Sequence, residues 1–182
     1  GNVVDPLGVI DTYGADALRF ALIFSTATGN DIPLAEDKIR GMKHFCNKLW
    51  NIARFILSSA EEKDFGVAPE PRTEADKIIL VKLAEVKNQI TQHLDTFDLH
   101  EAAQKIYQFT WHELADIYIE ESKTQLKDPA LADSTRAILA HTLIDSLKLL
   151  HPFIPFITEE IWSKLPIQNK KLLLVEEWPL VS

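Results

Sequence analysis

The sequence predicts an all-α protein, a helical bundle that ends in a short extended C-terminal tail. Apolar residues recur at three- and four-residue spacing through most of the 182 positions. Short polar breaks, several of which carry proline or glycine, separate these periodic segments. No segment alternates apolar and polar residues over the length of a half-buried strand. Helices packed on helices are therefore the expected architecture.

The first residues predict a helix, a glycine break and a second helix. Asp5-Pro6 has the pattern of an N-cap followed by proline at the first helical position. Gly14 is where this helix should end, because glycine tolerates the left-handed conformation of a helix terminus, and the next helix should begin at about Ala15. The chain opens in mid-phrase, with Gly1-Asn2 and no methionine, so we expect it to be part of a longer polypeptide.

Capping residues predict the boundaries of the later helices. Thr73 and Asp98 are expected N-caps, and Asp128-Pro129 combines a cap with a proline at the first helical position. His151-Pro152 should stop one helix, and Pro155 should begin the next. The expected segments are a helix at 35–60, a polar linker at 61–72, helices at 73–97, 98–122, 129–150 and 155–165, and an extended tail or small strand at 172–175.

Composition excludes several classes of protein. Apolar residues make up 46% of the chain, which is ordinary for a globular protein, and no apolar run reaches the roughly 20 residues that span a bilayer. The single cysteine, Cys46, excludes an internal disulfide and favours a reducing, cytoplasmic location. The net charge of −8 argues, by itself, against non-specific binding to nucleic acid.

One helix departs from this acidic character, the stretch KIRGMKHFCNKLWNIARFILSSA at 38–60. Its five Lys and Arg residues are accompanied by no Asp or Glu, so the remainder of the chain carries −13. A solvated helix usually interleaves charges of both signs. On a helical wheel the apolar face contains Ile39, Met42, Phe45, Cys46, Leu49, Trp50, Ile52, Ala53, Ile56 and Leu57, and the polar face contains Arg40, Lys43, His44, Asn47, Lys48, Asn51, Arg54 and Ser58.

The polar face suits a single-stranded nucleic acid. Lys and Arg can contact phosphates, Asn can pair with base edges, and an aromatic ring can stack on a base. Phe55 falls at the edge of this face, beside Asn51 and Lys48. Two plainer interpretations remain open, because polar helix faces are usually only solvated and Phe55 can instead pack against a neighbouring helix.

Signals for catalysis and metal binding are weak. His112-Glu113 looks like half of a metalloprotease HExxH motif, but Asp116 stands where the second histidine should be. Adjacent carboxylates such as Glu120-Glu121 point about 100° apart on a helix, which is poor geometry for acid–base catalysis. We therefore assign no catalytic residue and no metal ligand, and we expect no cofactor for this chain.

Four phrases together resemble a known family. GNVVDP, YGADALRF, NKLWNIARFIL and HPFIPFITEEIW, in this order and spacing, are similar to the C-terminal part of class I aminoacyl-tRNA synthetases of the Val, Ile, Leu and Met branch. Within that branch, GNDIPLAEDKIRGMKHFCNKLWN at 29–51 resembles the valyl enzymes. The resemblance covers essentially the whole chain.

The resemblance implies that the chain has two parts and that further domains of the same polypeptide lie outside it. In the family the residues matching Gly1-Asn2 follow the KMSKS loop of the catalytic domain, so 1–28 would be a helical connector and 29–182 the anticodon-binding bundle. The HIGH motif, the Rossmann catalytic domain and the editing domain would lie upstream, and the coiled-coil arm of valyl enzymes has no heptad run here. The longer enzyme would use ATP and Mg²⁺, whereas this chain alone should be inactive.

The resemblance also implies what the polar face touches. Carried over to the phrase NKLWNxxRF, it assigns anticodon contacts of a valine tRNA to Asn47, Lys48, Asn51, Arg54 and Phe55. Arg40, Lys43 and His44 are expected to add phosphate contacts. The protein is expected to be a monomer with no membrane association. The alternatives are an isoleucyl or leucyl relative, a helical protein-interaction module that docks a basic partner on its acidic faces, and a self-sufficient enzyme, which the lack of catalytic residues disfavours.

HPFIPFITEEIW is expected to be a packing motif, with two prolines at a sharp turn between helices. In it Phe153, Phe156, Ile157, Ile161 and Trp162 are expected to fill core. The expected buried residues of the bundle are Phe45, Leu49, Trp50, Ile56, Phe109, Leu143, Leu147, Phe156 and Trp162.

Overall fold

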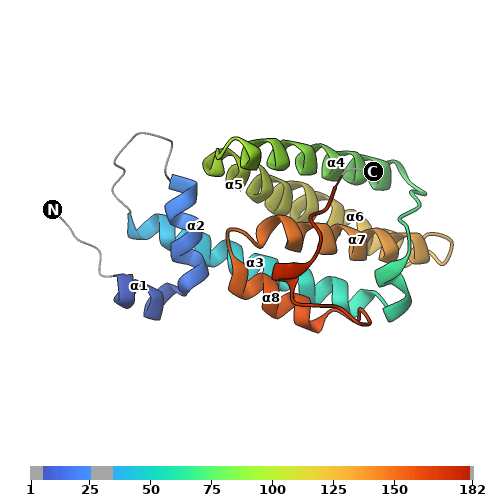
Figure 1. The fold of residues 1–182 in the computed structure, drawn as a ribbon. Coiled ribbons are helices and arrows are strands. Elements are labelled where there is room, and N and C mark those ends of the chain that lie inside the picture. The colour runs from blue at the N-terminus through green and yellow to red at the C-terminus, as the bar shows by residue number, and fades with distance from the viewer. Residues whose placement is uncertain (1–5, 26–34, 181–182) are drawn as a thin grey trace.

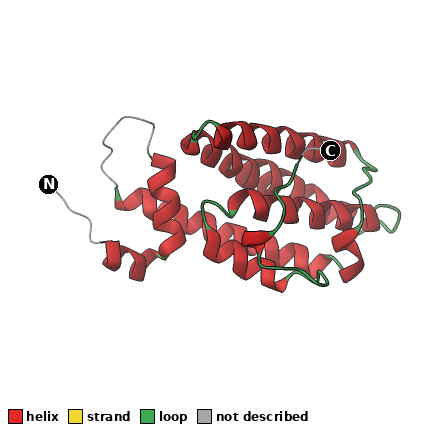
Figure 2. Ribbon diagram, viewed as in Figure 1, coloured by secondary structure: helices red, strands yellow, loops and turns green. Residues whose placement is uncertain are grey.

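The computed structural model is helical along most of its length (Figures 1 and 2). It describes residues 6–25 and 35–180, and no strand occurs within these ranges. None of the helices described there is long and apolar enough to cross a membrane. The elements are α1 (Pro6–Tyr13), α2 (Ala15–Ser25), α3 (Glu36–Ser59), the 3-10 turn η1 (Glu62–Gly66), α4 (Glu74–Asp95), α5 (Leu99–Gln108), the π-helical segment η2 (Phe109–Tyr118), α6 (Ile119–Gln125), α7 (Ala132–Leu150), α8 (Pro155–Lys164) and the 3-10 turn η3 (Leu173–Val175).

Helix α3 runs along the bundle and contacts elements from both ends of the chain. It packs against α2, α7, α8 and η2, while α4 lies beside α5, η2 and α7 on the opposite side of the core (Figure 1). The C-terminal tail returns across the bundle to α4, where Trp178 Nε1 donates a hydrogen bond to Thr91 Oγ1 at 2.9 Å. The all-helical bundle predicted from the sequence is confirmed.

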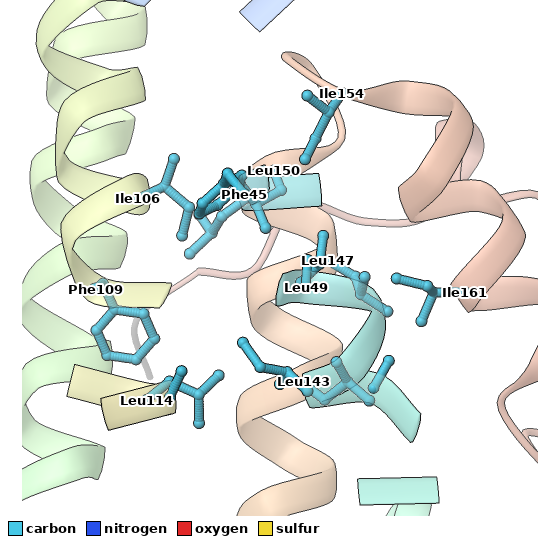
Figure 3. Packing of buried hydrophobic residues seen from close by; sticks show 14 of the residues in the cluster. Phe45, Leu49, Ile106, Phe109, Leu114, Leu143, Leu147, Leu150, Ile154 and Ile161 are labelled. Atoms are coloured by element: carbon cyan, nitrogen blue, oxygen red, sulfur yellow. The ribbon is translucent and has the colours of Figure 1, made fainter. Parts of the chain in front are cut away.

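The hydrophobic core forms where α3, α5, η2, α7 and α8 meet. Figure 3 shows Phe45 and Leu49 of α3 among side chains from α5, η2, α7 and α8. Of the nine residues predicted to be buried, seven are buried: Phe45, Leu49, Ile56, Phe109, Leu143, Leu147 and Trp162.

Two predicted core residues are corrections. Phe156 is 65% exposed, because it lies in the first turn of α8 and its side chain faces outward, away from the core. Trp50 is only half-buried, and its ring faces Lys164 Nζ at 5.8 Å from the ring centroid. Ile157, also expected to fill core, is half-buried.

Two of the identifying phrases meet at one hydrogen-bonded contact. Asp16 of α2 accepts hydrogen bonds from the backbone N–H of Phe156 at 3.2 Å and of Ile157 at 2.6 Å. These N–H groups have no partner within α8, because they lie in its first turn. Asp16 is buried, and this burial raises the pKa of its carboxyl group. An aspartate distant in sequence therefore supplies the N-terminal cap that α8 lacks locally.

The N-terminus of α4 is fixed by a capping box and by hydrogen bonds to other helices. Thr73 and Asp76 form the predicted cap as a reciprocal capping box, and Tyr118 donates a hydrogen bond to Asp76 Oδ1 at 2.8 Å. Gln125 Nε2 donates to Thr73 Oγ1 at 3.0 Å, and Thr135 Oγ1 donates to Gln125 Oε1 at 2.8 Å. This buried polar network joins the start of α4 to η2, α6 and α7.

Several boundaries differ from the sequence-based prediction. The helix expected at 98–122 is a continuous rod of α5, η2 and α6 that extends to Gln125 and has a π-helical centre. The helix expected from Pro129 begins at Ala132 instead, because Asp128 Oδ1 accepts from Ala130 N and closes a separate turn. The linker at 61–72 contains η1, and 173–175 is a 3-10 turn rather than extended chain. Gly14 has φ +90°, as the predicted helix break requires, whereas Asp5 lies outside the described residues.

The Asp16 cap leads to a prediction about stability. Asp16→Ala removes the only side-chain acceptor that the described chain offers to the N-terminus of α8, so its unfolding free energy in urea should fall by about 1–2 kcal/mol. Asp16→Asn is the matched control, because it keeps one acceptor oxygen and should lose less. An alanine variant as stable as the parent would contradict this account.

A second prediction concerns pH and His151, which follows α7 and contacts Thr158 Oγ1 through Nδ1 at 2.8 Å. Burial lowers the pKa of this imidazole below its ordinary value of about 6.5. The unfolded chain therefore takes up the proton at higher pH than the folded chain, and stability is complete above about pH 6.5 and falls as the pH drops below it. Urea unfolding at pH 7.5 and pH 5 should show a smaller loss in His151→Gln than in the parent. An equal loss in both proteins would remove His151 from the explanation.

Candidate nucleic-acid interface

The polar face of α3 is a continuous exposed surface. Its six exposed residues are spaced three and four apart, so they lie in one row along the helix. The opposite face carries the buried residues of the core, and the predicted amphipathic division of this helix is confirmed. We call this row the α3 stripe, and it consists of Arg40, His44, Asn47, Asn51, Arg54 and Ser58.

Two of the expected phosphate-binding cations already have partners inside the chain. Arg40 pairs with Asp37 at 2.5 Å, and Lys43 Nζ donates to the carbonyl oxygen of Thr12 at 2.7 Å. Lys43 also lies over the ring of Tyr13, 5.6 Å from its centroid. Because α3 begins at Glu36, two acidic residues precede the basic stretch within the same helix. The positive charge available to a ligand is smaller than the residue count predicts.

Lys48 is held beside the α3 stripe by the π-helical segment. Its Nζ lies 2.6 Å from Asp116 Oδ1 and 4.1 Å from the centroid of the Trp111 ring. The hydrogen bond and charge of Lys48 hold the pKa of the Asp116 carboxyl group below its usual range. His112 Nδ1 lies 3.3 Å from the other oxygen of the same carboxylate. The side chain of Lys48 therefore points toward η2 in this structure.

The remaining stripe residues are open to solvent. Asn47, Asn51, Arg54 and His44 are exposed, and their side chains make no hydrogen bond or ion pair with the described part of the chain. An arginine and two carboxamides in one exposed row can contact phosphate and base edges without first breaking an internal contact.

Phe55 is intermediate between the two interpretations that the sequence left open. Its side chain is half-buried and packs against the hydrophobic core, so only part of the ring faces solvent. Ser58 and Ser59 both donate hydrogen bonds to its carbonyl oxygen at 2.8 Å. The ring thus has a packing role, and its solvent-facing part adjoins the stripe.

Sequence reasoning missed the residues that other elements bring to this surface. Trp111 and Asp116 contact Lys48, and Thr12 contacts Lys43. The sequence signal for this contact lies in His112-Glu113 and Asp116, which by spacing alone resemble only an incomplete metal motif. Glu113 points the other way, to Lys82 of α4, with its Oε2 2.5 Å from Lys82 Nζ.

The described residues offer little for metal or nucleophilic chemistry. No group of three or more His, Cys, Asp or Glu side chains among them is arranged to hold a metal ion. Cys46 is half-buried, and burial raises its pKa to about 12, so the group remains a thiol at physiological pH.

This chain belongs to the family of anticodon-binding domains of tRNA ligases, whose family model matches residues 76–182. A second model, for class I tRNA synthetases of the I, L, M and V group, matches residues 1–35. Helix α3 lies between the two matched ranges.

Comparison with individual proteins covers α3 as well. The chain is 43% identical over 182 residues to a valine--tRNA ligase of Carboxydothermus hydrogenoformans, a match that covers 98% of this chain and 20% of that protein. It is 40% identical over 194 residues to a valine--tRNA ligase of Aquifex aeolicus, covering 98% of this chain and 17% of the relative. The chain thus spans about a fifth of the length of these curated relatives.

The fold is similar to that of solved synthetases. The LeuRS of Agrobacterium radiobacter K84, in its ternary complex with tRNA and LeuAMS, matches with a TM-score of 0.76 and 25% identity, over 100% of this chain and 21% of that one. The apo methionyl-tRNA synthetase of Mycobacterium tuberculosis matches with a TM-score of 0.66 over 87% of this chain and 34% of its own, and at 22% identity it supports the fold alone.

The half-buried position of Phe55 predicts the effect of a conservative change. Phe55→Leu keeps an apolar side chain but leaves part of the aromatic volume unfilled, so it should cost about 1 kcal/mol and lower the melting temperature by about 2–4 °C. Thermal unfolding followed by circular dichroism measures this. An unchanged melting temperature would contradict a stabilising role for the half-buried part of the ring.

Proposed function

We propose that this chain is the anticodon-binding domain of a valine--tRNA ligase and that its α3 stripe binds the anticodon loop of valine tRNA. The observation that carries the proposal is the row of exposed polar side chains on a helix whose other face is core, four of which, His44, Asn47, Asn51 and Arg54, make no hydrogen bond or ion pair with the described part of the chain. Arg54 supplies a phosphate contact, Asn47 and Asn51 read base edges, and the exposed part of Phe55 stacks on a base. His44 adds a phosphate contact, and Arg40, Lys43 and Lys48 add others once they release Asp37, the Thr12 carbonyl and Asp116.

Family membership and similarity to valine--tRNA ligases support the choice of ligand. The acidic remainder of the chain supports a confined site, because its charge of −13 repels phosphate elsewhere on the surface. The interaction should be weak for the chain alone, since few cations meet the loop.

The proposal extends to the longer enzyme. Residues 1–28 serve as the connector from an upstream catalytic domain, and 29–182 form the anticodon-binding bundle. That catalytic domain uses ATP and Mg²⁺ to attach valine to the tRNA, and this chain supplies none of the reacting groups. The enzyme acts in the cytoplasm as a monomer.

Two substitutions on the α3 stripe separate phosphate binding from base recognition. Arg54→Ala should weaken binding to all tRNAs to a similar degree and reduce the log–log salt slope by about one phosphate contact. Asn51→Ala should lower the preference for valine tRNA over an anticodon-altered version by roughly 1–3 kcal/mol. Fluorescence titrations at several salt concentrations measure both quantities.

Matched controls for this titration lie away from the stripe. Lys127→Ala removes an exposed cation between α6 and α7, and Asn88→Ala removes an exposed carboxamide on α4. Neither should change the affinity or the preference beyond a small uniform effect. Stripe variants that bind like the parent would place the tRNA site elsewhere, and a parent chain that binds basic proteins but not tRNA would favour the protein-interaction module.

A further inference from the structure

The π-helical form of η2 determines how Lys48 is held. In an α-helix, residues five positions apart point about 140° away from each other. The i→i+5 hydrogen bonding of a π-helix brings such residues close to the same side. Trp111 and Asp116 are five positions apart within η2, and both contact Lys48. The π-helical geometry therefore lets the Trp111 ring and the Asp116 carboxylate contact Lys48 of α3 together.

Lys48, held by Trp111 and Asp116, lies directly beside the α3 stripe. Lys48 is four residues from His44 and three from Asn51, so it is the neighbour of both on the helix surface. A ligand that lies along the stripe therefore passes beside Nζ of Lys48. In this structure that ammonium group donates its hydrogen bond to the carboxylate of Asp116 instead.

The ion pair between Lys48 and Asp116 can be broken at little cost, so that Lys48 can take another partner. The Lys48 side chain is 26% exposed and that of Asp116 is 48% exposed, so water reaches both partners. Ion pairs of this kind contribute little to stability, because water and salt screen them. Opening the pair costs little, and Trp111 still positions the ammonium group through its ring when the carboxylate is displaced.

We propose that Asp116 is an internal competitor for Lys48, which an RNA phosphate must displace when an anticodon loop binds the α3 stripe. This inference rests on the proposed function. An RNA that fits the stripe places a phosphate at Lys48 and offsets the loss of the Asp116 contact. An RNA that binds loosely leaves the pair closed and gains nothing from Lys48. Asp116 therefore lowers the affinity for all RNAs but penalises poorly fitting ones most.

Neutralising Asp116 tests the inference directly. In the 182-residue chain, Asp116→Asn should tighten binding of the anticodon-altered tRNA by about threefold to tenfold at low salt, and binding of valine tRNA by less. The log–log salt slope for the altered tRNA should steepen by about 0.7, the value for one phosphate contact on a single strand. Adding Lys48→Ala to Asp116→Asn should abolish the gain.

Glu113→Gln is the matched control. It removes the same single charge from η2 and frees a lysine, but that lysine is Lys82 on the far side of the segment. If the gain comes only from reduced repulsion of RNA, Glu113→Gln will reproduce it and the inference is overturned. Melting temperatures of both variants verify that each remains folded.

The outcomes separate this inference from the proposed function. If tRNA binding is lost in Arg54→Ala but is unchanged or weakened in Asp116→Asn, the competitor role is overturned and the proposed function stands. If the parent chain binds no tRNA, both fall together. If Asp116→Asn tightens binding and flattens the preference for valine tRNA, while Glu113→Gln does not, the competitor role is supported.

Discussion

The structure depends on the burial of one face of α3. Seven of its residues are buried, and they contact elements from both ends of the sequence. Each large apolar side chain among them contributes about 1.5–3 kcal/mol when fully removed from water. This burial fixes the rotation of the helix, so the opposite face is held in solvent as a straight row. The position of every polar group on the α3 stripe follows from the packing on the other side.

Hydrogen bonds between residues distant in sequence hold the other helices in place around α3. Asp16 caps α8 from the other end of the sequence, and Asp76 receives a hydrogen bond from Tyr118 across the bundle. The Asp16 contact joins the segments YGADALRF and HPFIPFITEEIW, neither of which lies on the proposed binding surface. Their role is to hold α2 and α8 against α3, and thereby to fix the scaffold under the stripe.

The amphipathic pattern was sufficient to predict the helices and the two faces of α3, because periodic burial is local in sequence. It could not predict the partners of Lys48, because the π-helical turn of η2 has no recognisable local signal and the contact with Asp116 spans 68 residues. Phe156 was mispredicted for a similar reason: an apolar residue after proline looks like core until the cap from Asp16 sets the orientation of α8. Internal partners of Arg40, Lys43 and Lys48 also reduce the positive charge that the residue count assigns to α3.

The central claim is that RNA binds on α3, which lies outside both family-matched ranges. Chemical-shift mapping tests it most directly, with the 20.6 kDa chain labelled with ¹⁵N and titrated with the anticodon stem-loop of valine tRNA. The account predicts that the largest amide shifts and line broadening fall on Asn47, Asn51 and Arg54, with smaller changes at Trp111 and Asp116. Changes confined to α4 and α5, with α3 unaffected, would contradict it.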